Sequence, residues 1–378
     1  MLSIGVIGRS RKENERRVPI HPGQLDCLPE EVRAGLRFER SYGEAFDTSD
    51  ASIAERTGGV ASREDLFAES DVILLAKPLL EDLEAMREGS ILWGWPHCVQ
   101  QQALTQAAID RRLTLIAWEA MHKWNSDGHF DMHIFNRNNE LAGYASVMHA
   151  MALRGVDGNY GPRRRALVLG FGSVGRGAAL ALRQLGVTDV KVFTQRNSPL
   201  VVDQMPGAEY CQFERSEQGL VVVQPDHHRR PFIEEIADAD IVVNAVLQDT
   251  DNPLMYLGKS EVDNLKSGSL IVDVSCDEGM GFPFARPTSF SDPIFRAGPA
   301  WYYAVDHSPS LFWDSASWEI STALTPILPI VMGGPNRWAK SLTITRAIEI
   351  RDGVIENPAI LSFQKRAAEY PHEVAQQT

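Results

Sequence analysis

The stretch that decides the fold of this chain reads Ala166-Leu167-Val168-Leu169-Gly170-Phe171-Gly172-Ser173-Val174-Gly175. Its apolar start predicts a short buried strand, and the alanines and leucines that follow it predict a helix. In the G-x-G-x-x-G pattern of Gly170, Gly172 and Gly175, the glycines permit a tight turn, close approach to a pyrophosphate and close helix–strand packing, in that order. We expect a dinucleotide here, with its pyrophosphate at Ser173 and Val174, because a helix N-terminus favours an anion. A purely structural turn is the alternative.

The composition limits the remaining possibilities. A chain of 378 residues is long for a single core, so two domains are expected. The net charge of −13 argues against nucleic acid or an anionic membrane as a partner. No apolar run approaches the roughly 20 residues of a membrane span, and the N-terminus lacks the features of a signal peptide. The cysteines form no C-x-x-C pair, which suits a reduced compartment. We therefore expect a cytoplasmic protein with small-molecule substrates, and a homo-oligomer is compatible with the sequence.

Apolar and helical segments alternate along the chain, which is typical of parallel sheets flanked by helices. The expected strands are Ser3–Ile7, Leu36–Glu39, Asp71–Lys77, Ser90–Trp95, Thr114–Trp118, Ala166–Leu169, Asp189–Thr194, Asp240–Val246, Leu270–Ser275 and Tyr302–Val305. Glu140–Arg154 is expected to be a helix that links two domains, and Ser317–Val331 a returning helix interrupted by prolines. The sequence thus predicts an α/β fold of two Rossmann-like domains with a cleft between them. Residues 1–135 and 310–378 would form a discontinuous substrate domain, and 140–308 the NAD(P)-binding domain.

The end of the second strand of the nucleotide domain indicates the cofactor. In an NAD site, an acidic residue about 20 residues after the glycines binds the ribose hydroxyls. Here Thr194, Gln195 and Arg196 stand at that place, and none is acidic. An arginine can bind a 2′-phosphate through two hydrogen bonds, so we expect NADP(H) rather than NAD(H); Arg196 as an ordinary surface residue is the alternative. Val246, at the end of a later strand, completes the expected cofactor site.

Three basic residues, Arg17, Lys77 and His97, follow expected strands of the first half of the chain. Ligands of open α/β sheets bind beyond the carboxyl ends of strands. Taken singly, Lys77 could be a surface lysine and His97 a loop histidine, but together before a dinucleotide fold they predict a site. His97 is our candidate general acid/base, because the ordinary pKa of histidine is close to neutral.

Several motifs in the same order resemble the superfamily of alanine dehydrogenases, transhydrogenases and saccharopine dehydrogenases. They are Lys12-Glu13-Asn14-Glu15-Arg16-Arg17-Val18-Pro19-Ile20-His21-Pro22, Lys77, His97, the glycine pattern and Asp273-Val274-Ser275-Cys276-Asp277. The resemblance implies that Arg17 binds a substrate carboxylate and that Lys77 and His97 are the substrate-binding and acid/base pair. It also implies that Asp277 lies beside the nicotinamide and is required for function.

A further segment indicates the branch of this superfamily. Val305-Asp306-His307-Ser308-Pro309-Ser310-Leu311-Phe312 resembles saccharopine dehydrogenases and N5-(carboxyethyl)ornithine synthases. These enzymes reduce an imine formed between a 2-oxo acid and the side-chain amine of a basic amino acid. By this resemblance pyruvate and NADPH are the expected substrate and reductant. Asp306 and Glu119, which stands at the end of the expected strand Thr114–Trp118, are candidates for binding the cationic amine donor; a purely structural role for Glu119 is the alternative.

Two departures leave the amine donor open. Pro78 stands where relatives often have a glutamate, and Met280-Gly281-Phe282-Pro283-Phe284 also differs from the saccharopine enzymes. One alternative is an alanine-type dehydrogenase that uses free ammonia, and another is a non-catalytic NADP-binding regulatory protein. No metal is expected, because His129, Asp131 and His133 lack an evident fourth ligand.

Overall fold

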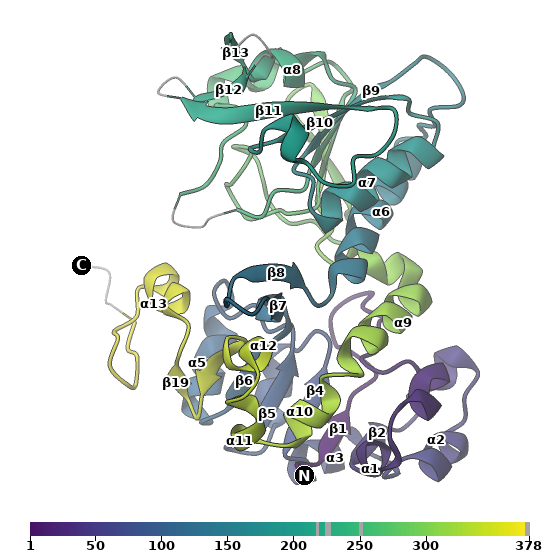
Figure 1. The fold of residues 1–378 in the computed structure, drawn as a ribbon, viewed down its shortest axis with the longest axis vertical. Helices are drawn as coiled ribbons and strands as arrows, with labels where there is room; N and C mark the ends of the chain where they lie inside the picture. The colour runs from purple at the N-terminus through teal and green to yellow at the C-terminus, as the bar shows by residue number, and fades with distance from the viewer. Residues whose placement is uncertain (217–218, 224–227, 249–251, 375–378) are drawn as a thin grey trace. The chain divides into compact units, whose positions relative to one another are not determined.

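The computed structural model describes residues 1–216, 219–223, 228–248 and 252–374, and it divides into two compact units (Figure 1). Unit 1 combines Met1–Asn136 with Phe312–Thr378, and unit 2 spans Arg137–Leu311. Each unit contains a large sheet, parallel in most of its strand pairs, with helices packed on it. The predicted α/β class, with parallel sheets flanked by helices, is confirmed.

Among the described residues, the large sheet of unit 1 has eight strands in the order β19-β18-β6-β5-β4-β1-β2-β3. Their bounds are β1 Ile4–Val6, β2 Leu36–Glu39, β3 Val60–Ala61, β4 Val72–Leu75, β5 Ile91–Gly94, β6 Thr114–Ala117, β18 Ile348–Arg351 and β19 Val354–Ile355. The strands from β6 to β3 pair in parallel, so their carboxyl ends meet at one edge. The late strand β18 joins β6 antiparallel. The helices that connect or cover these strands are α1 Glu30–Ala34, α2 Asp50–Arg56, α3 Arg63–Glu69, α4 Leu80–Ala85, α5 Gln102–Asp110, α9 Trp313–Leu324, α10 Leu328–Met332, α11 Pro335–Trp338, α12 Leu342–Thr345 and α13 Pro358–Gln364.

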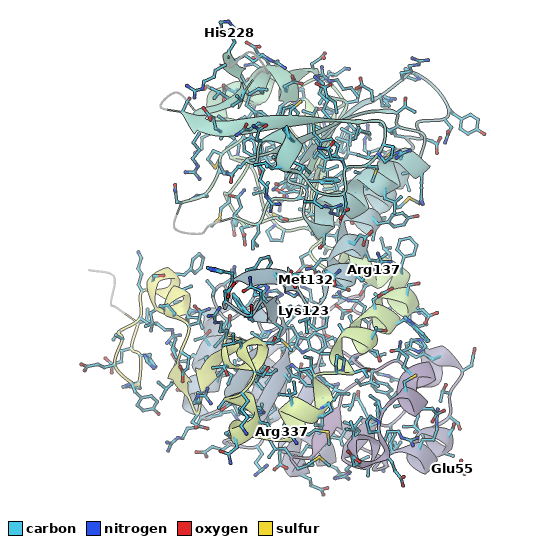
Figure 2. The ribbon with its side chains drawn as sticks, viewed as in Figure 1. Glu55, Lys123, Met132, Arg137, His228 and Arg337 are labelled. Carbon is cyan, nitrogen blue, oxygen red and sulfur yellow. The ribbon has the colours of Figure 1, made fainter. Side chains whose placement is uncertain are left out.

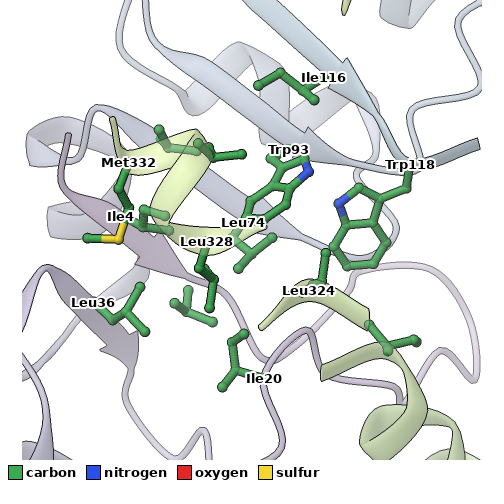
Figure 3. Packing of buried hydrophobic residues seen from close by; sticks show 14 of the residues in the cluster. Ile4, Ile20, Leu36, Leu74, Trp93, Ile116, Trp118, Leu324, Leu328 and Met332 are labelled. Carbon is green, nitrogen blue, oxygen red and sulfur yellow. The ribbon is translucent and has the colours of Figure 1, made fainter. Parts of the chain in front are cut away.

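The C-terminal segment completes the core of unit 1. Leu324, Leu328 and Met332 pack in one buried cluster with Leu74 and Trp93 of the sheet (Figure 3). The returning helix expected there is indeed interrupted: α9 ends at Leu324, and α10 begins at Leu328 with a proline in its first turn, the position where a missing N–H costs least. The segment from α9 to α10 is therefore part of the core of unit 1.

In the described part of unit 2, nine strands form a sheet in the order β13-β12-β11-β10-β9-β14-β15-β17-β16. Their bounds are β9 Arg165–Leu169, β10 Asp189–Thr194, β11 Ala208–Ser216, β12 Gly219–Val223, β13 Arg229–Pro231, β14 Ile241–Asn244, β15 Leu270–Asp273, β16 Ile294–Ala297 and β17 Ala300–Tyr303. The strands from β11 to β17 pair in parallel, whereas β12, β13 and β16 are antiparallel additions at the edges. The helices are α6 Asn136–Leu153, α7 Ser173–Gln184 and α8 Ile233–Asp238. Helices α6 and α7 lie side by side (Figure 1), joined by a 2.8 Å hydrogen bond from the Tyr144 hydroxyl to Gln184.

A small hairpin follows β6 in unit 1. Strand β7 (His122–Trp124) pairs antiparallel with β8 (Phe130–His133), and Lys123 stands opposite Met132 (Figure 2). His133 uses both ring nitrogens within the fold: Nδ1 accepts from the Phe135 N–H at 3.1 Å, and Nε2 lies 3.2 Å from the Glu119 carbonyl. In the described part of the chain, no helix combines the length and apolarity needed to cross a membrane.

Candidate functional site

Lys77 and His97 meet at the carboxyl edge of the first sheet. Lys77 follows β4 and His97 follows the neighbouring β5, so the parallel pairing brings both to the same edge. Lys77 is 7% exposed, and its Nζ lies 2.7 Å from His97 Nε2. A lysine this buried needs a partner with a lone pair or a negative charge. Here the partner is an imidazole, the side chain best suited to proton transfer near neutral pH.

Glu119 holds His97 from the other side. Its Oε1 accepts the His97 backbone N–H at 2.6 Å and lies 3.7 Å from His97 Nδ1. A carboxyl beside Nδ1 favours the proton on that nitrogen, which leaves Nε2 as the acceptor for Lys77. Burial first, and then the charge of Glu349, raise the pKa of Glu119 to about 8. Glu119, expected to bind the amine donor, is turned toward His97.

The side chains of Arg17 and Lys77 both lie close to the ring of Trp95. The Trp95 ring lies 4.9 Å from Arg17 Cζ and 5.9 Å from Lys77 Nζ, within the range of cation–π attraction. Glu15 Oε1 accepts from Arg17 Nε at 2.8 Å, and Glu15 Oε2 from Nη2 at 2.6 Å. This two-bond pairing fixes the guanidinium in one orientation. Unit 1 therefore brings together the predicted residues Arg17, Lys77, His97 and Glu119.

The glycine turn of unit 2 has the geometry of an anion site. Gly170 has φ +89°, and a Cβ on Gly175 would lie 2.1 Å from the Gly170 carbonyl oxygen, so both positions require glycine. A Cβ on Gly172 would meet nothing within 4 Å, which leaves open space in front of the turn. No side chain caps α7, which starts at Ser173 and continues through Val174, so a bound anion can accept hydrogen bonds from its first turn. These residues fit the pyrophosphate of a dinucleotide.

The predicted nucleotide-selecting residues lie at the carboxyl end of β10. Thr194 is the last residue of the strand, and its hydroxyl accepts the Arg196 N–H at 3.0 Å and donates to the Arg196 carbonyl. This turn places Gln195 and Arg196 on the exposed side of the chain. Val246 contacts the glycine turn, since a Cβ on Gly170 would lie 3.0 Å from its Cγ2. Thr194 thus ends β10, Gln195 and Arg196 follow it, and Val246 follows the end of β14; β10 and β14 are the neighbours of β9 on either side.

A buried polar network underlies Asp277. Asp273, at the end of β15, accepts from Tyr302 Oη at 2.7 Å and from Asn244 Nδ2 at 2.8 Å. Tyr302 Oη also lies 3.3 Å from Cys276 Sγ. The network anchors the turn that carries half-buried Asp277. Sequence reasoning assigned roles to neither Tyr302 nor Asn244, because single polar residues in buried strands carry no signal before the strand order is known.

Asp306 lies in the same unit. Its Oδ1 is hydrogen-bonded to Nδ1 of the buried His307, and 39% of its side chain is exposed. The negative charge of Asp306 also contributes, after burial and other charges, to the raised pKa of the thiol of Cys276, the residue before Asp277. In unit 1, Glu15 lies in the motif that contains Arg17, and Trp95 ends an expected strand, but the sequence alone predicted a binding role for neither; the spacing of Glu15 from Arg17 is the signal that could have shown the pairing.

Fold and site together define a nucleotide-binding α/β enzyme. The N-terminal domain model of alanine dehydrogenase/PNT matches residues 6–142, and the C-terminal domain model matches residues 140–358. The chain belongs to the alanine dehydrogenase/PNT family, as the motifs predicted. With that membership, its predicted class as an NAD(P)-dependent oxidoreductase acting on CH–NH bonds is confirmed.

Known relatives cover most of the chain. An N(5)-(carboxyethyl)ornithine synthase of Clostridium botulinum is 27% identical over 327 residues, which are 82% of this chain and 91% of that protein. An alanine dehydrogenase of Mycobacterium tuberculosis is 26% identical over 329 residues, 83% of this chain and 84% of that protein. A solved L-alanine dehydrogenase structure has a TM-score of 0.76 at 21% identity and covers 96% of this chain and 99% of its own. The last of these similarities is evidence for the fold alone.

Proposed function

We propose that this chain is an NADPH-dependent oxidoreductase that reduces the imine formed between a 2-oxo acid and an amine of a basic amino acid. Pyruvate is the 2-oxo acid that we propose first. The product would be an N-(carboxyalkyl) amino acid. The observation that carries the proposal is the 2.7 Å contact between Lys77 Nζ and His97 Nε2, with Arg17 on the Trp95 ring that Lys77 also approaches. It combines a carboxylate-binding group, a carbonyl-polarising group and a proton carrier.

Each side chain has a distinct task in this proposal. The Arg17 fork, fixed by Glu15, binds the 2-oxo acid carboxylate. The Lys77 ammonium faces the carbonyl oxygen and stabilises the negative charge that forms on it as the amine adds. His97 passes protons to the leaving water and takes them from the amine. Glu119 keeps the imidazole oriented through its contacts with the His97 N–H and Nδ1. Asp277, by the resemblance, lies beside the nicotinamide.

The cofactor site is assigned to unit 2. When bound there, a nicotinamide nucleotide supplies the hydride that turns the imine carbon into a secondary amine. Gly170, Gly172 and Gly175, with the backbone of Ser173 and Val174, are assigned to the pyrophosphate. The exposed Arg196, with Thr194 and Gln195, supports NADPH over NADH, because no acidic side chain stands at the strand end to repel a 2′-phosphate.

The choice of amine donor is supported by the carboxyethylornithine synthase relative and by the Asp306 motif. Because Glu119 is turned toward His97, we assign the cationic end of the donor to Asp306, whose side chain is 39% exposed. The test is an NADPH-oxidation assay with pyruvate and, in turn, ornithine, lysine, arginine and ammonium, with products identified by mass spectrometry. Turnover with a basic amino acid and formation of an N-carboxyethyl product is the expected result.

The second candidate is an amino-acid dehydrogenase that uses free ammonia, supported by the alanine dehydrogenase relative of Mycobacterium tuberculosis. If NADPH is oxidised with pyruvate and ammonium alone, and no basic amino acid increases the rate, this second function holds and the first proposal is wrong. A regulatory protein that binds NADP without turnover is the third candidate. Cofactor binding with no oxidation under any substrate pair would favour it.

A further inference from the structure

Gln364 is a buried polar residue at the end of helix α13, which lies at the yellow end of the chain in Figure 1. Its side chain reaches a segment far earlier in the sequence. Gln364 Nε2 lies 2.6 Å from the carbonyl oxygen of Cys98, 266 residues away, and 3.2 Å from the carbonyl oxygen of Val99. Cys98 is the residue directly after His97. Helix α13 therefore donates to the turn that carries the candidate acid/base.

The backbone of His97 is in a conformation that needs support. Its φ is +49°, in the left-handed region that few residues other than glycine adopt. A residue in this region persists only where its surroundings fix it. The His97 N–H donates to Glu119 at 2.6 Å, and the His97 carbonyl accepts from the Gln100 N–H at 3.1 Å. Gln364 adds a hydrogen bond to the next carbonyl along the chain, that of Cys98.

Arg366 sets the orientation of the Gln364 amide. Arg366 Nε lies 2.6 Å from Gln364 Oε1, and an arginine nitrogen can only donate a hydrogen bond. The amide oxygen must therefore face Arg366, and the NH₂ group must face the Cys98 carbonyl. Arg366 is itself 7% exposed, and it donates to Gln106 Oε1 at 2.8 Å and to the His372 carbonyl at 3.1 Å. The amide cannot turn over without losing its contacts on both sides.

His372 fixes the segment that carries Arg366. It is 1% exposed; its Nε2 accepts the Ile355 N–H at 3.0 Å, so Nδ1 has the proton that is donated to the Ala367 carbonyl at 3.0 Å. Gln364, Arg366 and His372 all follow residue 358, where the match to the C-terminal domain model ends. The contact with Cys98 is thus a feature of this chain beyond the two matched domains.

The Cys98 carbonyl does not need Gln364 in order to be hydrogen-bonded. The Thr105 hydroxyl, on α5, already donates to it at 2.9 Å. A buried carbonyl with one partner has avoided most of the cost of burial, so a second donor contributes little by satisfying it. Two donors from different helices instead hold the oxygen in one place. The Gln364 amide therefore has the arrangement of a group that positions the turn.

We propose that Gln364 is a positioning residue for His97. By holding the Cys98 carbonyl, it fixes the direction in which the imidazole leaves the backbone, and with it the 2.7 Å approach of His97 Nε2 to Lys77 Nζ. A displacement of about 1 Å at a reacting group can lower a rate by about 100-fold. The inference rests on the proposed function in taking His97 as the acid/base.

The first test needs no substrate. Histidine labelled with carbon-13 at ring Cε1 gives separate NMR signals, and the signal of His97 is the one missing from His97→Gln. Gln364→Met preserves the length of the side chain and removes its donor. We expect this variant to shift or broaden the His97 signal and to leave the signal of the exposed His129 in place.

Gln364→Glu is the second variant, and it keeps the test informative if Gln364→Met does not fold. It retains an oxygen that accepts from Arg366, and at about pH 8 it replaces the donating NH₂ group by an oxygen that repels the Cys98 carbonyl. The His97 signal should move in this variant as well. Circular dichroism shows which variants are folded. A folded variant of either kind with an unmoved His97 signal overturns the inference.

The matched control is a change in the packing of the same helix. Ile360 is 0% exposed in the apolar cluster that α13 shares with the first sheet. Ile360→Val and Ile360→Ala weaken this packing without removing a hydrogen bond. Of the two, the variant whose fall in Tm is closer to that of Gln364→Met serves as the control, and it should retain the wild-type His97 signal. An equal movement of the signal in the control would show that general loosening of α13 is the cause, and would overturn the positioning role.

The second test is the division of the effect between kcat and KM in the imine-reduction assay. In Gln364→Met we expect kcat to fall by about 10- to 100-fold. The KM for the 2-oxo acid should change little, because Arg17 belongs to another loop. Wild-type kcat in Gln364→Met, or an equal fall in the Ile360 control, overturns the inference. If the His97 signal moves as expected but the wild type reduces no imine with any amine, the proposed function fails and the positioning of the His97 side chain stands.

Discussion

Lys77 Nζ lies 2.7 Å from His97 Nε2, and this contact requires that one of the two nitrogens carries a lone pair. Two cations at that separation would repel each other in a partly buried site. The carboxyl of Glu119 lies 3.7 Å from the other ring nitrogen, Nδ1, and favours a proton there. The arrangement is therefore a lysine ammonium donating to a neutral imidazole. Protonation of His97 at Nε2 removes the lone pair that accepts this hydrogen bond.

Replacing His97 by glutamine should remove the acid/base group and retain a hydrogen-bonding side chain. General acid/base groups contribute about 10²- to 10⁴-fold to rates, so we expect kcat to fall by that order. NADPH affinity, measured by fluorescence titration, should be unchanged. The matched control is His129→Gln, at an exposed histidine before β8, which should retain full turnover. A His97→Gln enzyme with wild-type kcat would show that His97 carries no proton in the slow steps.

Replacing Arg17 by lysine preserves the charge and removes the fork. Arg17 is held in one orientation by its hydrogen bonds to Glu15, which a lysine cannot reproduce. Loss of one charge-assisted hydrogen bond to the substrate carboxylate costs about 1.5–3 kcal/mol, or about 10- to 100-fold. We expect the KM for the 2-oxo acid to rise by this factor, with little change in the KM for the amine.

The neighbouring exposed Arg16 supplies the control for that experiment, because its guanidinium stacks on Trp313 and has no assigned role. Arg16→Lys should leave both KM values as they are. Equal increases in the KM for the two substrates in Arg17→Lys would show that Arg17 shapes the site as a whole and does not select the carboxylate.

The repeating part of the fold could be predicted from the sequence. The runs that became β4, β5, β6, β9 and β15 are continuous apolar segments bounded by polar ones, because strands buried on both faces of a parallel sheet need no alternation. The glycine turn after β9 could also be predicted, because the spacing of its glycines is set by the positive φ of Gly170 and the close backbone contact at Gly175. Lys77 and His97 could be expected at one edge because they follow parallel strands.

The antiparallel edges could not be predicted in the same way. Residues 208–216 form β11, which pairs in parallel with β10 and carries the antiparallel β12 on its other side; they mix an exposed Glu209 with a buried Phe213, and a pattern of this kind is common in loops as well. Glu349 is a clear case in the first sheet. A glutamate between two isoleucines indicates a half-exposed strand, yet Glu349 is buried at the point where the pairing of β18 with β6 shifts its register. That shift depends on a partner strand more than 200 residues earlier in the chain.

Replacing Arg196 by alanine tests the choice of nucleotide. If Arg196 binds the 2′-phosphate, the variant should lose about 10- to 100-fold in NADPH affinity, the equivalent of one or two hydrogen bonds to a charged group. NADH, which has no 2′-phosphate, should bind as before, so the ratio of the two dissociation constants is the measurement. Arg183→Ala, at an exposed arginine in the last turn of α7, is the control. An unaltered ratio in Arg196→Ala would move the assignment to another residue.

The buried carboxyl of Asp273 should make the free energy of unfolding depend on pH. Burial raises its pKa from 3.8 to about 7, although Tyr302 and Asn244 both donate to it. A group whose pKa is higher in the folded state than in the unfolded state contributes its full stabilisation below the unfolded value and loses it as the pH rises through the folded value. Asp273 therefore stabilises the fold least above about pH 7.

Asp273→Asn should remove this dependence with little change in structure. The asparagine oxygen can accept from Asn244, and its amide can donate to the Tyr302 hydroxyl, which then donates to Cys276. We expect the difference in Tm between variant and wild type to shift in favour of the variant as the pH rises from about 5 to about 8, by about 2–4 °C for each kcal/mol. Thermal melts across that range measure it. Carboxyl groups elsewhere, Glu119 and Glu349 among them, cancel in the difference because they are the same in both proteins. Two parallel Tm curves would mean that Asp273 ionises in the fold as it does in the unfolded chain, and that Tyr302 and Asn244 fully offset its burial.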